Sequence, residues 1–413
     1  MLKDRSPETA SPGKRLELAD IFARHGGEFL EGHRVPERHL KVMRAVVNCR
    51  TATLGGHRDK CGSCDFERYV YHSCRNRHCP KCQTHSKEAW RKARQLELLP
   101  VPYFHQVFTL PHELNAWVLA SESNQRKLLS LLFAAASATL LDFGQGELGG
   151  QVGFTLVLHT WDQQLRPHFH LHGLIASGAL CDDGSRWRAG GSKFLFPVRA
   201  LSKVFRGKFL DGLEQLLDAG ELDRPRSETE EVGIERRLLR KLSKKSWVVY
   251  SKAPFAGPRK LLDYLSRYTH RVAISNERLV TCDDGQVTFN YRDRRDADRR
   301  KQLTLRAVQF IGRFLSHVLP DGFMRIRHYG FLANRDRTIR LATIGELLGV
   351  RPPEPSPRES LEQWLREILG IDLDACPCCG GELQRIELEP VRPVVPIAGP
   401  RCRSRGPPQE AHE

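Results

Sequence analysis

The sequence predicts an α+β fold in which a central antiparallel sheet is flanked by helices, with a helical, cysteine-rich domain before it. Residues 151–160 and 168–177 are two apolar strand patterns joined by the short polar turn 161–167, which is typical of an antiparallel hairpin. Helical patterns lie before and after this hairpin, among further short strands. Strands in hairpins mixed with helices indicate an α+β domain.

The other elements follow from hydrophobic periodicity along the chain. Pro36 and Pro258 stand at the start of helical patterns, where a missing N–H is tolerated. Helices are predicted at 16–30, 36–49, 112–143 (as one or two helices), 199–220, 234–245, 258–271, 305–319 and 360–369. Strands are predicted at 103–110, 246–251, 271–275, 278–282, 286–292 and 323–332.

Charge is distributed unevenly along the chain. The formal net charge of +16 favours a polyanionic partner. Residues 234–260 hold nine Lys or Arg against the single acid Glu235, and the run 291–301 is also arginine-rich. Together these runs predict a surface that follows nucleic-acid phosphates. The cations that we assign to it here are Arg236, Arg237, Arg240, Lys241, Lys244, Lys245 and Lys260.

Two observations bear on the compartment. No apolar run approaches the roughly 20 residues that a membrane helix needs. The start of the sequence, residues 1–15, lacks the apolar region of a secretory signal. We therefore expect a cytoplasmic protein without a membrane partner.

Cysteines are numerous and clustered. Twelve cysteines in a cytoplasmic chain favour metal binding over disulfides. The pairs Cys61/Cys64 and Cys79/Cys82 have Cys-x-x-Cys spacing and are separated by fourteen residues, which is close to the spacing of a structural zinc site. We expect these four thiolates to bind one Zn²⁺. The donors expected for a possible second zinc site are Cys49, His57, Cys74 and His78.

Two further features surround the cysteines. Lys60, Arg75, Arg77 and Lys81 lie beside the predicted knuckles and fit contact with nucleic acid. Residues 376–381, CPCCGG, form a half-knuckle with no good second pair after it.

Three histidines alternate along one predicted strand. His168, His170 and His172 share one face, because successive strand side chains point to opposite faces, while Phe169 and Leu171 face the core. Imidazoles that converge from one strand suit a divalent metal, although three partly exposed histidines on an edge strand would cost little.

Two tyrosines lie four residues apart on the predicted helix 258–271. Tyr264 and Tyr268 therefore share one face, among the basic side chains of Lys260, Arg267 and Arg271. Tyrosine pairs at this spacing are common in packing. A phenol is a poor nucleophile at neutral pH unless a metal or cations stabilise its phenolate.

The order of these motifs resembles that of the two-tyrosine rolling-circle transposases of bacterial insertion sequences, in the HUH endonuclease superfamily. The resemblance lies in HFHLHGLIASGAL (168–180) and YLSRYTHRVAIS (264–275). It is supported by CRNRHCPKCQ (74–83), LPVPYFHQVFTLPHEL (99–114) and GFMRIRHYGFL (322–332), and it covers residues 35 to 350. Members of this family differ in one respect: they tend to have Pro where Phe169 stands, and a glycine run where Ser177-Gly178 stands.

The resemblance implies a division of roles. His170 and His172 would bind Mg²⁺ or Mn²⁺, with His159 as the third ligand and His168 as the alternative. One tyrosine would cleave single-stranded DNA at the element ends or target, leaving a 5′-phosphotyrosine and a 3′-OH, and the second would allow a further strand transfer. Zn²⁺ would remain in the knuckles, and Arg267 and Arg271 would contact DNA.

Other functions remain open on the sequence alone. A plasmid replication initiator or relaxase would use the same chemistry. However, the histidine motif at 170–172 precedes the tyrosines here, which is not the usual order in relaxases. A zinc-knuckle nucleic-acid-binding protein without catalysis would need structural histidines and tyrosines. A zinc hydrolase would need a general base that we cannot identify.

These features predict four regions. Residues 1–14 are expected to be disordered, 15–95 to form a helical zinc-binding and DNA-binding domain, and 96–350 to form the catalytic domain. Residues 351–413 are expected to hold a Pro-rich linker, a short helix, the half-knuckle and a disordered tail.

Overall fold

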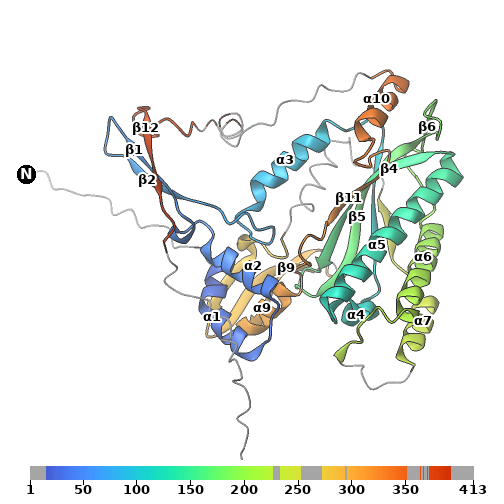
Figure 1. Cartoon of the computed structure of the whole chain (residues 1–413), viewed down its shortest axis with the longest axis horizontal. Helices are drawn as coiled ribbons and strands as arrows, with labels where there is room; N and C mark the ends of the chain where they lie inside the picture. The colour runs from blue at the N-terminus through green and yellow to red at the C-terminus, as the bar shows by residue number, and fades with distance from the viewer. Residues whose placement is uncertain are drawn as a thin grey trace, which may run out of the picture.

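The computed structural model of the chain (Figure 1) describes residues 15–226, 233–252, 272–293, 295–350 and 372–391, with single positions 363, 366 and 370. The predicted helix 258–271 lies outside the described residues, as do the expected disordered segment 1–14, the Pro-rich run 351–360 and the tail beyond 391.

The largest sheet is antiparallel throughout and confirms the predicted α+β fold. Its strand order is β11-β4-β5-β3-β7, and β6 pairs with β5 beside this path. The predicted hairpin is β4 and β5, at the centre of the sheet. The strands are β3 (Tyr103–Thr109), β4 (Gln151–Trp161), β5 (Pro167–Leu180), β6 (Trp187–Ala189), β7 (Val249–Lys252) and β11 (Ile326–Gly330).

Asp162 closes the turn between β4 and β5. Its carboxylate accepts hydrogen bonds from the backbone N–H groups of Gln164 and Arg166, each at 2.8 Å. Leu165 adopts a positive φ of 60° in this turn, and its side chain is buried. The turn fixes the register in which His159 stands opposite His170.

Four helices cover one face of this sheet (Figure 1). Side chains of α5 and α6 form a single core with Phe169, Leu171 and Ile175 of β5. Full burial of such a side chain stabilises the fold by about 1.5–3 kcal/mol. The layer consists of α4 (Asn115–Leu119), α5 (Glu122–Phe143), α6 (Val198–Asp218) and α7 (Ile234–Lys244), and the single-turn helices η2 (His112–Leu114) and η3 (Gly144–Leu148) flank α4 and α5.

The run Glu122–Leu148 is also, among the described residues, a helix long and apolar enough to cross a membrane. However, 56% of its most apolar window is buried inside the protein. Ser121 caps its start by accepting a hydrogen bond from the N–H of Asn124. The buried side chains of this helix, Leu128, Leu132 and Phe133 among them, belong to the main core.

A second core joins the N-terminal helices to a small antiparallel sheet of order β10-β9-β8. Phe22 of α1 packs edge to face on Phe314 of α9, which shows how closely the two segments interlock. The elements are α1 (Leu18–Gly32), α2 (Glu37–Asn48), β8 (Leu279–Asp283), β9 (Gln286–Asp293), β10 (Arg299–Arg306) and α9 (Ala307–Leu315), with η5 (Asn276–Arg278) before β8.

A third sheet joins an N-terminal hairpin to a C-terminal strand of the described chain. Its order is β12-β1-β2, so a C-terminal strand pairs with the cysteine-bearing hairpin (Figure 1, upper left). Its strands are β1 (Gly56–Cys61), β2 (Glu67–Tyr71) and β12 (Leu383–Leu388). The remaining elements are η1 (Ala52–Leu54), α3 (Gln83–Gln95) and α10 (Arg337–Leu347).

Candidate metal centres and active site

Three histidines meet on the face of the large sheet that is opposite to the layer of α4, α5, α6 and α7. His170 and His172 project from β5, and His159 is the β4 residue paired with His170. The two Nε2 atoms of His170 and His172 lie 3.1 Å apart. Ring nitrogens of all three residues lie within 4.8 Å of one another, and all three side chains are buried. The sheet thus directs three imidazole donors to one point.

Protonation of the two β5 rings is constrained by their neighbours. Nδ1 of His170 lies 2.8 Å from the carbonyl oxygen of His168, which can only accept, so this nitrogen carries a proton. In a neutral ring, Nε2 of His170 is then an acceptor that faces Nε2 of His172. A proton on His172 Nε2 or a bound cation can satisfy this acceptor, so the donor set fits a divalent metal.

His105 lies on β3, the strand beside β5, and its ring contacts that of His172. This residue was not among the sites predicted from the sequence. Its Nε2 is 2.9 Å from Nδ1 of His172, and the two rings stack with centroids 5.2 Å apart. Burial, helped by the charge of Lys252, lowers the pKa of His105 to about 4, so the ring is neutral at pH 7. A neutral His105 can accept the Nδ1 proton of His172. In the sequence, the only signal for His105 was its position within the predicted strand 103–110.

The structure separates the two candidates for the third ligand. His159 lies within the cluster, whereas His168 is exposed and outside the group of nitrogens within 4.8 Å. The ring of His168 instead lies against His170, with centroids 4.6 Å apart. Tyr264 and Tyr268 lie outside the described residues, as do Lys260, Arg267 and Arg271.

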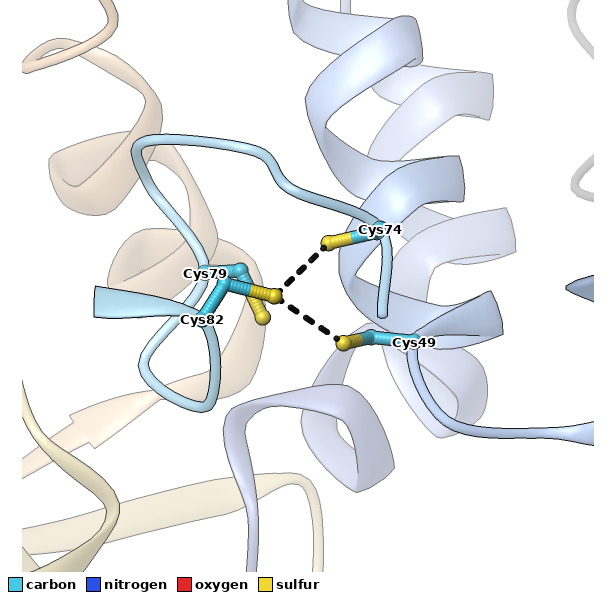
Figure 2. Close-up of side chains that lie close together, drawn as sticks. All are labelled: Cys49, Cys74, Cys79 and Cys82. Atoms are coloured by element: carbon cyan, nitrogen blue, oxygen red, sulfur yellow. Dashed lines mark hydrogen bonds between the residues drawn. The ribbon is translucent and has the colours of Figure 1, made fainter. Parts of the chain in front are cut away.

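Four cysteine sulfurs converge beside the second core (Figure 2). Cys49 follows α2, Cys82 precedes α3, and Cys74 and Cys79 lie in the loop between β2 and α3. Sγ of Cys82 is 3.4 Å from Sγ of Cys49 and 3.6 Å from Sγ of Cys74. Thiolates 2.3 Å from a tetrahedral zinc ion lie about 3.8 Å apart, so the spacing fits Zn²⁺. It is far longer than the roughly 2.05 Å of a disulfide.

The expected grouping of the Cys-x-x-Cys pairs is therefore wrong. Cys79 and Cys82 are grouped with Cys49 and Cys74, and not with Cys61 and Cys64. The reason is the β1–β2 hairpin: Cys61 ends β1 and Cys64 lies in the following turn, so this pair is carried to the hairpin tip. The loop 74–82 returns to the end of α2, where the other four sulfurs meet.

The histidines expected in the second zinc site lie elsewhere. Nε2 of His57 is 3.7 Å from a carboxylate oxygen of Asp59, and His57 belongs to no cysteine cluster. Burial, together with the nearby charges of Arg77 and Arg325, lowers the pKa of His78 well below its usual value. His78 is likewise outside both clusters.

The basic side chains near the knuckles have different surroundings. The guanidinium of Arg77 donates to the backbone carbonyls of Phe323, at 2.8 Å, and Pro320, at 3.2 Å, so it joins the loop 74–82 to the segment before β11. Lys81 pairs with Glu17 at 2.7 Å. Arg75 is exposed, as a phosphate contact requires.

A second arginine joins α3, which follows Cys82, to the histidine-bearing face of the large sheet. Arg94 of α3 contacts Nε2 of His328 at 3.1 Å, and because Arg only donates, His328 donates its Nδ1 proton to Thr155 at 2.8 Å. Burial, with the charges of Arg94 and Arg337, lowers the pKa of His328 to about 3. Thr155 lies on the same face of β4 as His159, so α3 is fixed near the histidine cluster.

The basic helix α7 has one apolar and one cationic face. Ile234, Leu238 and Leu242 are buried in the main core, which places α7 on the helical side of the sheet, opposite to the histidines. Lys241 and Lys245 lie 3.7 Å and 2.9 Å from Glu113. The exposed cations of α7 are Arg236, Arg237, Arg240, Lys241 and Lys244.

Comparison with known families defines the class of protein. A family described as a putative transposase matches residues 153–338, which include the three clustered histidines. A family described as a transposase zinc-binding domain matches residues 21–110, which include six of the cysteines. Together they define a transposase with an N-terminal zinc-binding domain.

Individual relatives identify the family. The chain is 44% identical to the putative transposase y4qJ of Sinorhizobium fredii over 90% of its own length and 95% of the relative's. It is 28% identical to the transposase for insertion sequence element IS801 of Pseudomonas savastanoi pv. phaseolicola, over 93% and 91%. The chain belongs to this family of insertion-sequence transposases.

Among solved structures, the chain is similar to the conjugative relaxase TrwC in complex with oriT DNA. The metal-free complex matches with a TM-score of 0.23 and 16% identity, over 40% of this chain and 71% of the relaxase chain. The metal-bound complex matches with a TM-score of 0.22 and 15% identity, over 40% and 69%.

Proposed function

We propose that this transposase cleaves and rejoins single-stranded DNA at element ends and target through a 5′-phosphotyrosine intermediate on Tyr264 or Tyr268. The observation that carries the proposal is the buried cluster of His159, His170 and His172 within the family match 153–338. In the reaction, the phenolic oxygen forms a bond to the scissile phosphorus as the bond from phosphorus to the 3′ oxygen breaks. The phenol loses its proton, and the leaving oxygen gains one to become a 3′-OH. Rejoining reverses these steps.

The histidine cluster would hold Mg²⁺ or Mn²⁺, which would polarise a phosphoryl oxygen and orient the phosphate. The chain's own residues prepare the site. The carbonyl of His168 keeps the proton of His170 on Nδ1, which leaves Nε2 as a donor for a cation. If His172 held the ion through Nε2, its proton would lie on Nδ1, where Nε2 of His105 at 2.9 Å could accept it.

The proposal is tested by trapping the covalent adduct. Full-length protein is mixed with a labelled pool of single-stranded DNA and Mn²⁺ and analysed on a denaturing gel before and after protease. We expect a metal-dependent labelled band at protein size, with the DNA linked to Tyr264 or Tyr268 by peptide mapping. The double variant Tyr264→Phe/Tyr268→Phe should form no adduct.

Tyr250→Phe is the matched control, because Tyr250 lies on β7 at the histidine-bearing face and is 52% exposed. It should form the adduct at the wild-type rate. Cleavage that survives in the double Phe variant would exclude both tyrosines as nucleophiles. Binding without any adduct, on native element ends, would favour a non-catalytic zinc-knuckle protein.

His105 gives a second, more specific prediction. His105→Ala removes the partner of His172 Nδ1, so we expect Mn²⁺ affinity to fall by roughly 10–100-fold, as for other neighbours of metal ligands. Cleavage should recover at high Mn²⁺. His105→Gln, whose amide oxygen can accept the same proton, should restore part of the affinity. Calorimetric Mn²⁺ titration measures both, and unchanged affinity in His105→Ala would remove His105 from the site.

A further inference from the structure

Two cysteine turns from opposite ends of the chain face each other in the third sheet. Cys61 and Cys64 lie at the tip of the β1–β2 hairpin, and Cys376 and Cys379 lie before β12. Sγ of Cys61 is 3.5 Å from Sγ of Cys379, and Sγ of Cys64 is 3.6 Å from Sγ of Cys376. These distances match those of the first cysteine cluster and approach the roughly 3.8 Å of a tetrahedral zinc site.

The two turns have the same local geometry. In the first, the N–H of Ser63 donates to Sγ of Cys61 at 3.3 Å. In the second, the N–H of Cys378 donates to Sγ of Cys376 at 3.4 Å. Amide hydrogens directed at sulfur stabilise a thiolate, which is the form that binds zinc. Each turn therefore offers one half of a site.

Glycine permits the close approach of the turns. A Cβ on Gly381 would lie 2.8 Å from Oγ of Ser63 and 3.3 Å from Sγ of Cys379. Gly380 has a positive φ of 73°, a conformation that favours glycine. The sequence Gly380-Gly381 thus serves this contact.

An ion-pair bridge fixes the same segments independently of the sulfurs. The carboxylate of Asp59 on β1 is inaccessible to solvent and accepts from Arg68 of β2 at 2.8 Å and from Arg385 of β12 at 3.1 Å. Arg68 also donates to the carbonyl of Leu373 at 3.0 Å. A buried carboxylate is costly unless it is paired, so β12 completes a polar core that the hairpin alone leaves open.

We propose that Cys61, Cys64, Cys376 and Cys379 bind a second structural Zn²⁺, which fastens residues 372–391 onto the N-terminal hairpin. Each half supplies two thiolates, and a closed structural site needs four, so the metal requires both ends of the chain. The match to the transposase zinc-binding domain ends at residue 110. The proposed site therefore adds the C-terminal residues Cys376 and Cys379 to zinc binding. It does not depend on the catalytic proposal.

The test uses full-length protein and two cysteine variants. Cys376→Ser/Cys379→Ser should contain one equivalent of zinc fewer than the wild type, measured by elemental analysis after dialysis. Cys378→Ser is the matched control, because Cys378 belongs to the same turn but to neither cluster, and it should keep the wild-type content. An unchanged zinc content in the double variant would overturn the proposal.

A second measurement is valid even if the double variant folds poorly. A site for a specific protease is inserted within residues 351–360 of the otherwise wild-type chain, and the folded protein is cut there. The C-terminal fragment should co-elute with the remainder on size exclusion, and native mass spectrometry should show one zinc more on the complex than on the remainder alone. A fragment that separates in the presence of zinc, or a complex without that extra zinc, would refute the site.

Discussion

His170→Ala should lower the rate of single-strand cleavage by at least about 10³-fold while leaving the protein folded. The side chain is one of three imidazoles that converge on the histidine-bearing face. A divalent ion contributes several kcal/mol of charge stabilisation in phosphoryl transfer, and each 1.36 kcal/mol is tenfold in rate. His172→Ala should behave similarly. Single-turnover cleavage of labelled DNA at saturating Mn²⁺ measures the rate, and circular dichroism checks the fold.

His168→Ala is the matched control on the same strand. Its side chain is exposed and outside the cluster, and the interaction that it makes with His170 through its backbone carbonyl is retained. We expect a change of no more than a few-fold. If His168→Ala abolished cleavage and His159→Ala did not, the third ligand would be His168. Full activity in His170→Ala would remove the cluster from the reaction.

Cys79→Ser should unfold the unit built on the second core, which α1 and α2 share with β8, β9, β10 and α9. Cys49 and Cys79 are fully buried within the second core, together with Phe22 of α1. Zinc binding to four-ligand sites contributes about 10–16 kcal/mol in isolated peptides, which is comparable to the roughly 5–15 kcal/mol stability of a whole domain. Loss of one ligand should therefore remove the metal and the cooperative thermal transition of this unit. Calorimetry and zinc analysis give the two readouts.

Cys282→Ser provides the comparison within the same core. Cys282 is buried there but belongs to no cysteine cluster. The variant should keep its zinc and lose at most about 1–3 kcal/mol, the cost of burying a hydroxyl, because the Arg24 side chain lies within hydrogen-bond reach of this position. Equal thermal transitions for Cys79→Ser and Cys282→Ser would show that the cluster binds no structural metal.

Local patterns predicted the sheet and its histidine face because both depend on alternation along neighbouring strands. β4 and β5 are adjacent in sequence, and the polar turn between them sets their register, so residues 151–177 contained the necessary information. His105 was harder to find. It reaches His172 only through pairing of β3 with β5, which joins residues 67 positions apart.

The cysteine clusters show the opposite case. Spacing alone could not decide which pairs meet, because Cys-x-x-Cys turns are interchangeable and their grouping depends on where β1, β2 and β12 lie. The half-knuckle at 376–379 lacked a second pair after it because its partners precede it by more than 300 residues. The strand β10 was also missed, since its sequence RRKQLTLR is largely exposed and carries no clear apolar alternation.

Pairing of β1 with β12 has a consequence for biosynthesis. Cys61 and Cys379 are 318 residues apart, so closing this loop costs conformational entropy that only late contacts can offset. During translation, the hairpin emerges early, and the thiols of Cys61 and Cys64 and the carboxylate of Asp59 then lack the partners that residues 376–385 supply. The third sheet can be completed only when nearly all of the chain has left the ribosome. Chains that end before β12 would therefore leave β1 with an unpaired edge, to which a strand of another chain can add.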